Sequence, residues 1–153
     1  MNKKLIFTPI IIGLISPSLV IFYLQVFVAD YTITASLSDI MSHQFAAGHN
    51  LFLLAFIGLI PFALLSVILF YYEKKNSKIK TSILMFSGLI GILMLMLPAH
   101  YSIWYPLYEP NHMSSTAVIA FLFIPIYCVL TMFIGIFIGT KINKIKGLNK
   151  NYE

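Results

Sequence analysis

The sequence contains no arginine and a single cysteine, Cys128, and only 10% of its 153 residues are charged. One cysteine excludes a disulfide framework, a CxxC redox pair and a zinc site built from cysteines. The hydrophobic fraction of 59% and the charged fraction of 10% exclude an ordinary water-soluble domain, in which about 45–50% of residues are apolar and about 25% are charged. It also excludes intrinsic disorder, which requires low hydrophobicity. These absences together indicate a small membrane protein.

Four stretches lack Asp, Glu, Lys, Arg and His, and each is long enough to cross a bilayer, which takes about 20 helical residues. The four stretches are 5–29, 51–72, 81–99 and 113–140. None of them alternates between polar and apolar residues as a membrane β-strand does. We therefore predict an all-α membrane protein with four transmembrane helices in one domain, 1–140, arranged as an antiparallel up-and-down bundle. A basic tail, 141–153, follows.

All ten basic residues are lysines, and none of them occurs in the two loops 30–50 and 100–112. They precede the first span, connect the second to the third, and follow the fourth: Lys3, Lys4, Lys74, Lys75, Lys78, Lys80, Lys141, Lys144, Lys146 and Lys150. Because positive charge marks cytoplasmic loops, both termini are predicted to be cytoplasmic, in a bacterial plasma (inner) membrane. The lysines would also attract anionic lipids at the cytoplasmic face. The net charge of +5 therefore needs no nucleic acid to explain it.

Small residues recur at helical spacing within the spans, and the clearest stripe ends with Gly135 and Gly139. Helices in a bilayer associate where small residues let their backbones approach closely. We therefore expect both glycines to pack inside the bundle, although a GxxxG pair could instead form a homodimer interface. Each span also contains proline, and neighbouring helices or Ser/Thr hydroxyls are expected to satisfy the carbonyl groups that it frees.

The first external loop contains Ser36-Leu-Ser-Asp39, which has the form of a helix capping box. A short helix over 37–47 would gather apolar side chains, including Phe45, on one face. Such a helix should lie in the outer membrane interface. Its polar face would carry Asp39 and His43, turned toward water or toward the second external loop.

The second external loop is rich in aromatic residues and contains two prolines. Tyrosine and tryptophan are typical of the belt at headgroup depth, and the same residue types dominate binding hot spots. We therefore select Trp104, Tyr105 and Tyr108 as candidate anchors for a protein partner at the external face.

All four histidines lie outside the predicted spans. His49, His100 and His112 lie at the outer ends of spans, with Glu109 nearby. Imidazole and carboxylate groups are ligands for zinc and copper(II). No HxxxH or HExxH spacing accompanies them, so no cofactor is expected, and a zinc or copper site is kept as an alternative.

The sequence has no GxSxG, P-loop or GxGxxG motif, which disfavours an enzyme. The spans also lack the carboxylates, histidines and arginines that proton relays and ion-coupled transporters use. We predict an interaction, accessory or protective protein that acts through helix faces and external loops. Two alternatives stay open: a metal- or cofactor-handling protein that uses the external histidines, and an oligomeric pore lined by Ser, Thr and Gly.

In its small size, basic charge and layout of four apolar spans, the chain resembles immunity proteins against pore-forming bacteriocins. The resemblance rests on the hydropathy and charge layout. It implies a protective role in the membrane that requires no catalytic residue.

Overall fold

The computed structural model describes residues 3–45, 50–108 and 117–145, and all regular elements in these ranges are helical. The elements are Lys3–Phe27 (α1), Ile33–Ser42 (α2), Leu51–Gly58 (α3), Ile60–Glu73 (α4), Lys78–Trp104 (α5), the 3₁₀ helix Tyr105–Leu107 (η1) and Ala117–Ile145 (α6). Helices α1, α5 and α6 each contain a stretch that is long and apolar enough to cross a membrane. A fourth such stretch exists if α3 and α4 count as one bent span. The predicted all-helical class is therefore confirmed, with helices of membrane-spanning length and composition.

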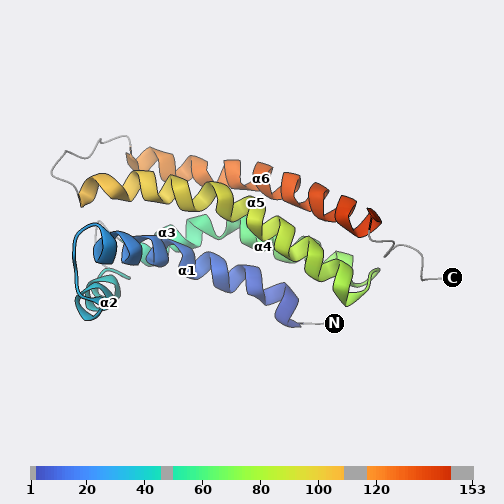
Figure 1. The fold of residues 1–153 in the computed structure, drawn as a ribbon, viewed down its shortest axis with the longest axis horizontal. Coiled ribbons are helices and arrows are strands. Elements are labelled where there is room, and N and C mark those ends of the chain that lie inside the picture. The colour runs from blue at the N-terminus through green and yellow to red at the C-terminus, as the bar shows by residue number, and fades with distance from the viewer. Residues whose placement is uncertain (1–2, 46–49, 109–116, 146–153) are drawn as a thin grey trace.

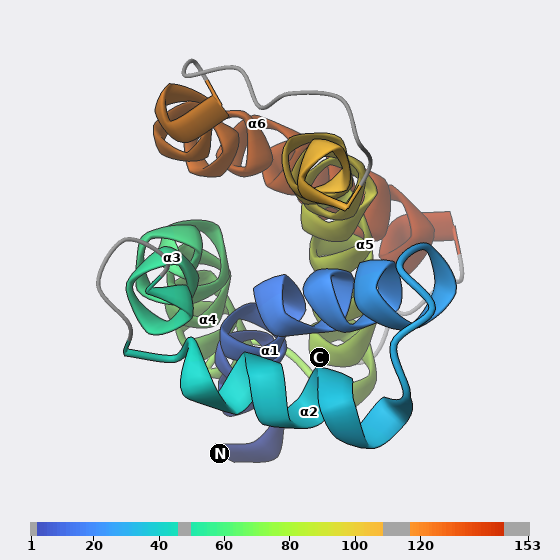
Figure 2. The ribbon, with the colours of Figure 1, turned by 90° about the vertical axis from the view of Figure 1, so that its left-hand side faces the viewer.

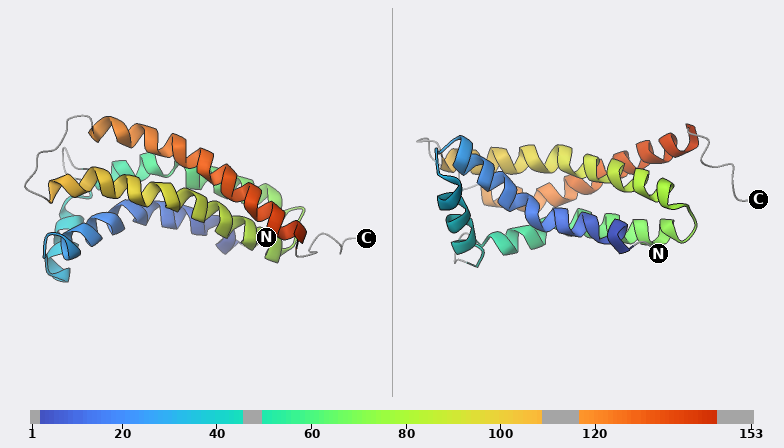
Figure 3. Two further views of the ribbon diagram at one scale, coloured as in Figure 1. Left: turned by 45° about the horizontal axis from the view of Figure 1, so that its top comes forward. Right: turned by 60° about the horizontal axis from the view of Figure 1, so that its bottom comes forward.

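The long helices lie side by side, and α5 packs along α6 more extensively than any other pair of elements (Figure 1). Helix α1 contacts α3, α4 and α5 on the other side of the molecule (Figure 2). Helix α2 lies across one end of this array, as two further views also show (Figure 3). We call this the α2 end, and the opposite end, where the first and last described residues and the α4–α5 connection lie, the lysine end.

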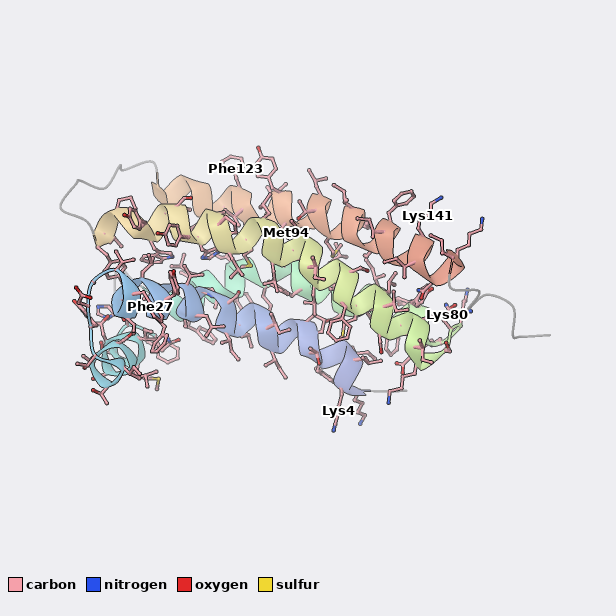
Figure 4. The ribbon with its side chains drawn as sticks, in the orientation of Figure 1. Lys4, Phe27, Lys80, Met94, Phe123 and Lys141 are labelled. Atoms are coloured by element: carbon pink, nitrogen blue, oxygen red, sulfur yellow. The ribbon has the colours of Figure 1, made fainter. Side chains whose placement is uncertain are left out.

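The outside of the helices is strongly apolar. Phe123 and Met94 project from α6 and α5 with exposed fractions of 50% and 75% (Figure 4). The same view places Lys4, Lys80 and Lys141 at the lysine end. An apolar outer surface with lysines gathered at one end suits a bilayer, because lipid tails solvate apolar side chains and charged groups remain near the interface.

Helices α5 and α6 touch backbone to backbone at their small residues. A Cβ atom built on Gly135 would overlap the carbonyl oxygen of Ser87, and one built on Gly91 would overlap the carbonyl oxygen of Thr131. A Cβ atom on Gly139 would overlap the hydroxyl of Ser87. The small stripe of the last helix therefore faces α5 of the same chain.

The prolines are accommodated in two ways. Pro17 has no N–H group to donate to the carbonyl of Gly13, and the hydroxyl of Ser16 donates to that carbonyl at 3.1 Å instead. Pro61 coincides with a real break, because α3 and α4 meet at 42° around Leu59. Its missing N–H and its ring interrupt the helical hydrogen bonding there, so the predicted span 51–72 is bent.

The helix that contains the predicted third span, 81–99, extends beyond it at both ends. Helix α5 continues through Pro98 to Trp104, because the residues after the proline still have a core to pack against. Trp104 joins the apolar cluster of Val20 and other α1 residues. His100 consequently lies within a helix and is buried, whereas the sequence predicted it in a loop.

The short helix of the first external loop is present, but its predicted bounds were wrong. Helix α2 begins at Ile33, and its cap is Thr32, whose hydroxyl accepts a hydrogen bond from the backbone N–H of Ala35 at 3.2 Å. It ends at Ser42, well before residue 47. Ser36 does not cap the helix because its hydroxyl is engaged by another helix.

Candidate functional site

Gln25 of α1 is the centre of a buried polar network at the α2 end. Its side chain is 1% exposed. Its Oε1 accepts a hydrogen bond from Ser36 Oγ at 2.7 Å, and its Nε2 donates to Asp39 Oδ2 at 2.6 Å. Nε2 also lies 3.3 Å from the hydroxyl of Tyr108. Since an unsatisfied buried amide is costly, these bonds hold α2 and the segment after η1 against α1.

Asp39 of α2 and His43, the residue at the C-terminal cap of that helix, lie one turn apart, as their spacing predicts. His43 Nδ1 is 3.4 Å from Asp39 Oδ1, and the two side chains are 42% and 39% exposed. The predicted polar face of the short helix is therefore turned partly inward. Through Gln25 it reaches Tyr108 of the second external loop.

The phenol of Tyr108 keeps its proton in this setting. Burial raises the pKa of Tyr108 above its ordinary value, the hydrogen bond from Gln25 opposes that change, and the nearby Asp39 and Tyr31 raise the pKa further. At neutral pH the neutral hydroxyl can accept from Gln25 and still donate its own hydrogen.

A cavity of about 210 Å³ opens beside this network. It is lined by Ile21, Asp39, His43, Leu51, Trp104, Leu107 and Tyr108. We call it the Asp39 cavity. It brings together residues from α1, α2, α3, α5 and η1, so side chains from both predicted external loops line one cavity.

The three aromatic residues selected from the sequence have different surroundings. Trp104 is 5% exposed, and its ring centroid lies 5.5 Å from that of Phe121. It is therefore a core residue that borders the Asp39 cavity, not an exposed anchor. Tyr108 is half-buried in the Gln25 network, and half-buried Tyr105 stacks on Tyr101 with ring centroids 5.2 Å apart.

A row of aromatic rings on the outside of α1 and α5 was not foreseen from the sequence. It consists of Phe27, Tyr23, Tyr101 and Tyr105, with successive ring centroids 5.0, 6.4 and 5.2 Å apart. Phe27 and Tyr23 are 67% and 51% exposed, and Figure 4 shows Phe27 near the α2 end. The available signal was the i, i+4 spacing of both pairs, which places the two rings of each pair on one helix face. We call these four residues the aromatic row.

The proposed metal set is described at one of its four positions. His100 is 3% exposed, and its ring contacts that of Phe121 with centroids 5.4 Å apart. The other three residues, His49, Glu109 and His112, lie outside the described residues. In the described part of the chain, no three His, Cys, Asp or Glu side chains are grouped to hold a metal ion.

In comparisons with known proteins, no protein-family model, no curated protein and no solved structure matches the chain.

Proposed function

We propose that this chain is an integral membrane interaction protein, of an accessory or protective (bacteriocin-immunity-like) kind, that binds a protein partner at its α2 end. The observation that carries the proposal is the buried Gln25 network, which joins α1, α2 and the segment after η1. A preorganised surface loses less conformational entropy on binding than a loose one.

The aromatic row supplies the contact surface in this proposal. Its rings are partly exposed and already in contact with one another, so little side-chain freedom remains to be lost. Large rigid rings commonly carry most of the binding energy at protein interfaces. Tyr105 keeps its proposed role as an anchor within this row, whereas Trp104 and Tyr108 support the surface from behind.

The orientation that fits this function has four crossings, both termini in the cytoplasm of a bacterial cell and the α2 end outside. Its support is the gathering of lysines at the opposite end (Figure 4). The lysine end would then lie against the anionic lipids of the inner leaflet. The α2 end carries Asp30 and Asp39 and is free of lysine in the sequence.

We expect cysteine accessibility to follow this orientation. In intact cells, a membrane-impermeant thiol reagent should label Ser38→Cys and leave Asn76→Cys unlabelled until the membrane is permeabilised. The unmodified chain is the control, because its Cys128 is buried and should not react. Labelling of Asn76→Cys from outside would contradict the orientation.

We also expect the aromatic row to be the surface that contacts the partner. A photo-reactive benzoyl-phenylalanine placed at Tyr23 should cross-link in living cells to one discrete protein. The same residue at Phe86, which is 60% exposed on the half of α5 nearer the lysine end, should give no such product. Equal yields of the same product at both positions, or no protein product at Tyr23, would argue against this function.

A further inference from the structure

We propose that the Asp39 cavity binds an organic cation, namely a primary ammonium or guanidinium group carried on a short apolar or aromatic stem. The proposal rests on the cavity itself and does not require the proposed function. The cation could be a free amine, or it could be the basic side chain of a protein partner. The cavity would recognise the positive charge by the same groups in both cases.

The cavity has an apolar part and a polar rim. Ile21, Leu51 and Trp104, all at most 5% exposed, form the apolar part. Asp39, His43 and Tyr108 supply the polar groups. An apolar site with a few convergent polar groups is the usual form of a small-molecule pocket, in which the polar groups set the orientation of the ligand.

The charge of this end selects a cation. The stretches of sequence that reach this end carry acidic but no basic charges: residues 5–72 contain Asp30 and Asp39, and Glu109 is the one charged residue of 81–140. Among the residues that the structure describes, Asp39 is the carboxylate that lines the cavity. Its two described side-chain partners are Gln25 and His43, and a carboxylate offers about four acceptor sites. Acceptor capacity therefore remains for an ammonium or guanidinium group.

The aromatic walls favour the same ligand. Trp104 and Tyr108 both line the cavity, and the face of an indole or phenol ring attracts a cation that lies within about 6 Å of it. The carboxylate of Asp39 would repel an anion. A purely apolar ligand would leave the remaining acceptor capacity of that carboxylate unused.

The volume limits the size of the ligand. A cavity of about 150 Å³ holds benzene, so about 210 Å³ admits one ring with an aminomethyl group, or the aliphatic stem of a lysine. Benzylammonium and Nα-acetyl-lysine methylamide are therefore suitable probes for the free-amine and side-chain sources.

Trp104 is the only tryptophan of the chain, so its fluorescence reports on this cavity alone. We expect titration of the purified full chain in detergent to give a saturable change in Trp104 emission with one or both probes. Benzyl alcohol and Nα-acetyl-norleucine methylamide, which lack the positive charge, should bind at least ten-fold more weakly. Asp39→Asn should weaken binding of the cations at least ten-fold, whereas Asp30→Asn, which alters a carboxylate outside the cavity, should not.

A second variant separates loss of the site from loss of folding. Leu107→Phe enlarges an exposed side chain at the cavity and leaves Asp39 unchanged, so it should also abolish the response while circular dichroism stays unaltered.

Saturation by benzylammonium would identify a free amine as the ligand, and saturation by the capped lysine alone would identify a basic side chain. The proposal is overturned if neither cation saturates, or if the neutral compounds bind as well as the cations and Asp39→Asn has no effect. Each of these results is independent of the cross-linking at Tyr23.

Discussion

Replacing Gly135 with isoleucine should lower the free energy of unfolding in detergent by about 2 kcal/mol. Isoleucine gains about 0.5 kcal/mol over glycine in intrinsic helix propensity, so an unpacked Gly135 would predict a small stabilisation. The structure predicts the opposite, because a Cβ atom at this position already overlaps the carbonyl of Ser87. Overpacking costs about 1–3 kcal/mol, and a backbone carbonyl cannot move aside as a flexible side chain can.

Thermal unfolding followed by circular dichroism measures this effect, and Phe133→Ile is the matched control. Phe133 lies on the same helix and is 49% exposed, so its replacement should change the stability little. Gly135→Ala should show a smaller loss than Gly135→Ile, since only the Cβ atom is added. If Gly135→Ile kept full stability but abolished a dimer, the small stripe would be an interface between two copies, as the GxxxG pattern also allows.

The helices could be predicted from sequence because their cause is local. Long uncharged runs form helices in a bilayer whatever surrounds them, since each backbone group must find its partner within its own segment. The ends of helices depend on more distant contacts. The predicted third span stopped at residue 99 because His100 follows it, yet α5 continues to Trp104, whose ring packs on a surface that α1 supplies.

The candidate site depends on distant contacts even more strongly. Ser36 has the correct spacing for a cap, but its hydroxyl donates to Gln25, and Thr32 caps α2 instead. Gln25 bonds to Asp39, 14 residues away, and to Tyr108, 83 residues away. An amide in an apolar span indicates a hydrogen bond to another helix, but it does not indicate which side chains are its partners. Its importance follows from burial, which one sequence does not reveal.

Among replacements of polar residues at the α2 end, Gln25→Leu should therefore be the most damaging. It should lower the free energy of unfolding by about 3 kcal/mol. The change leaves the hydroxyl of Ser36, which is 0% exposed, without its acceptor, and it removes a donor from the carboxylate of Asp39. Released from α1, helix α2 should also exchange its backbone amide hydrogens faster. Thermal unfolding and hydrogen exchange of the same preparation measure both consequences.

A double-mutant cycle distinguishes this network from a general intolerance of Gln25 to change. Ser36→Ala removes the hydroxyl that Gln25→Leu would leave unsatisfied, so the double variant should be more stable than the sum of the two losses predicts, by about 1 kcal/mol. Gln44→Leu, the same substitution at a residue whose side chain bonds only to the Ile40 carbonyl among the described contacts, should cost much less. Strictly additive losses at Gln25 and Ser36 would mean that the two side chains do not share a hydrogen bond. The α2 end would then lack the preorganisation that its proposed partner surface requires.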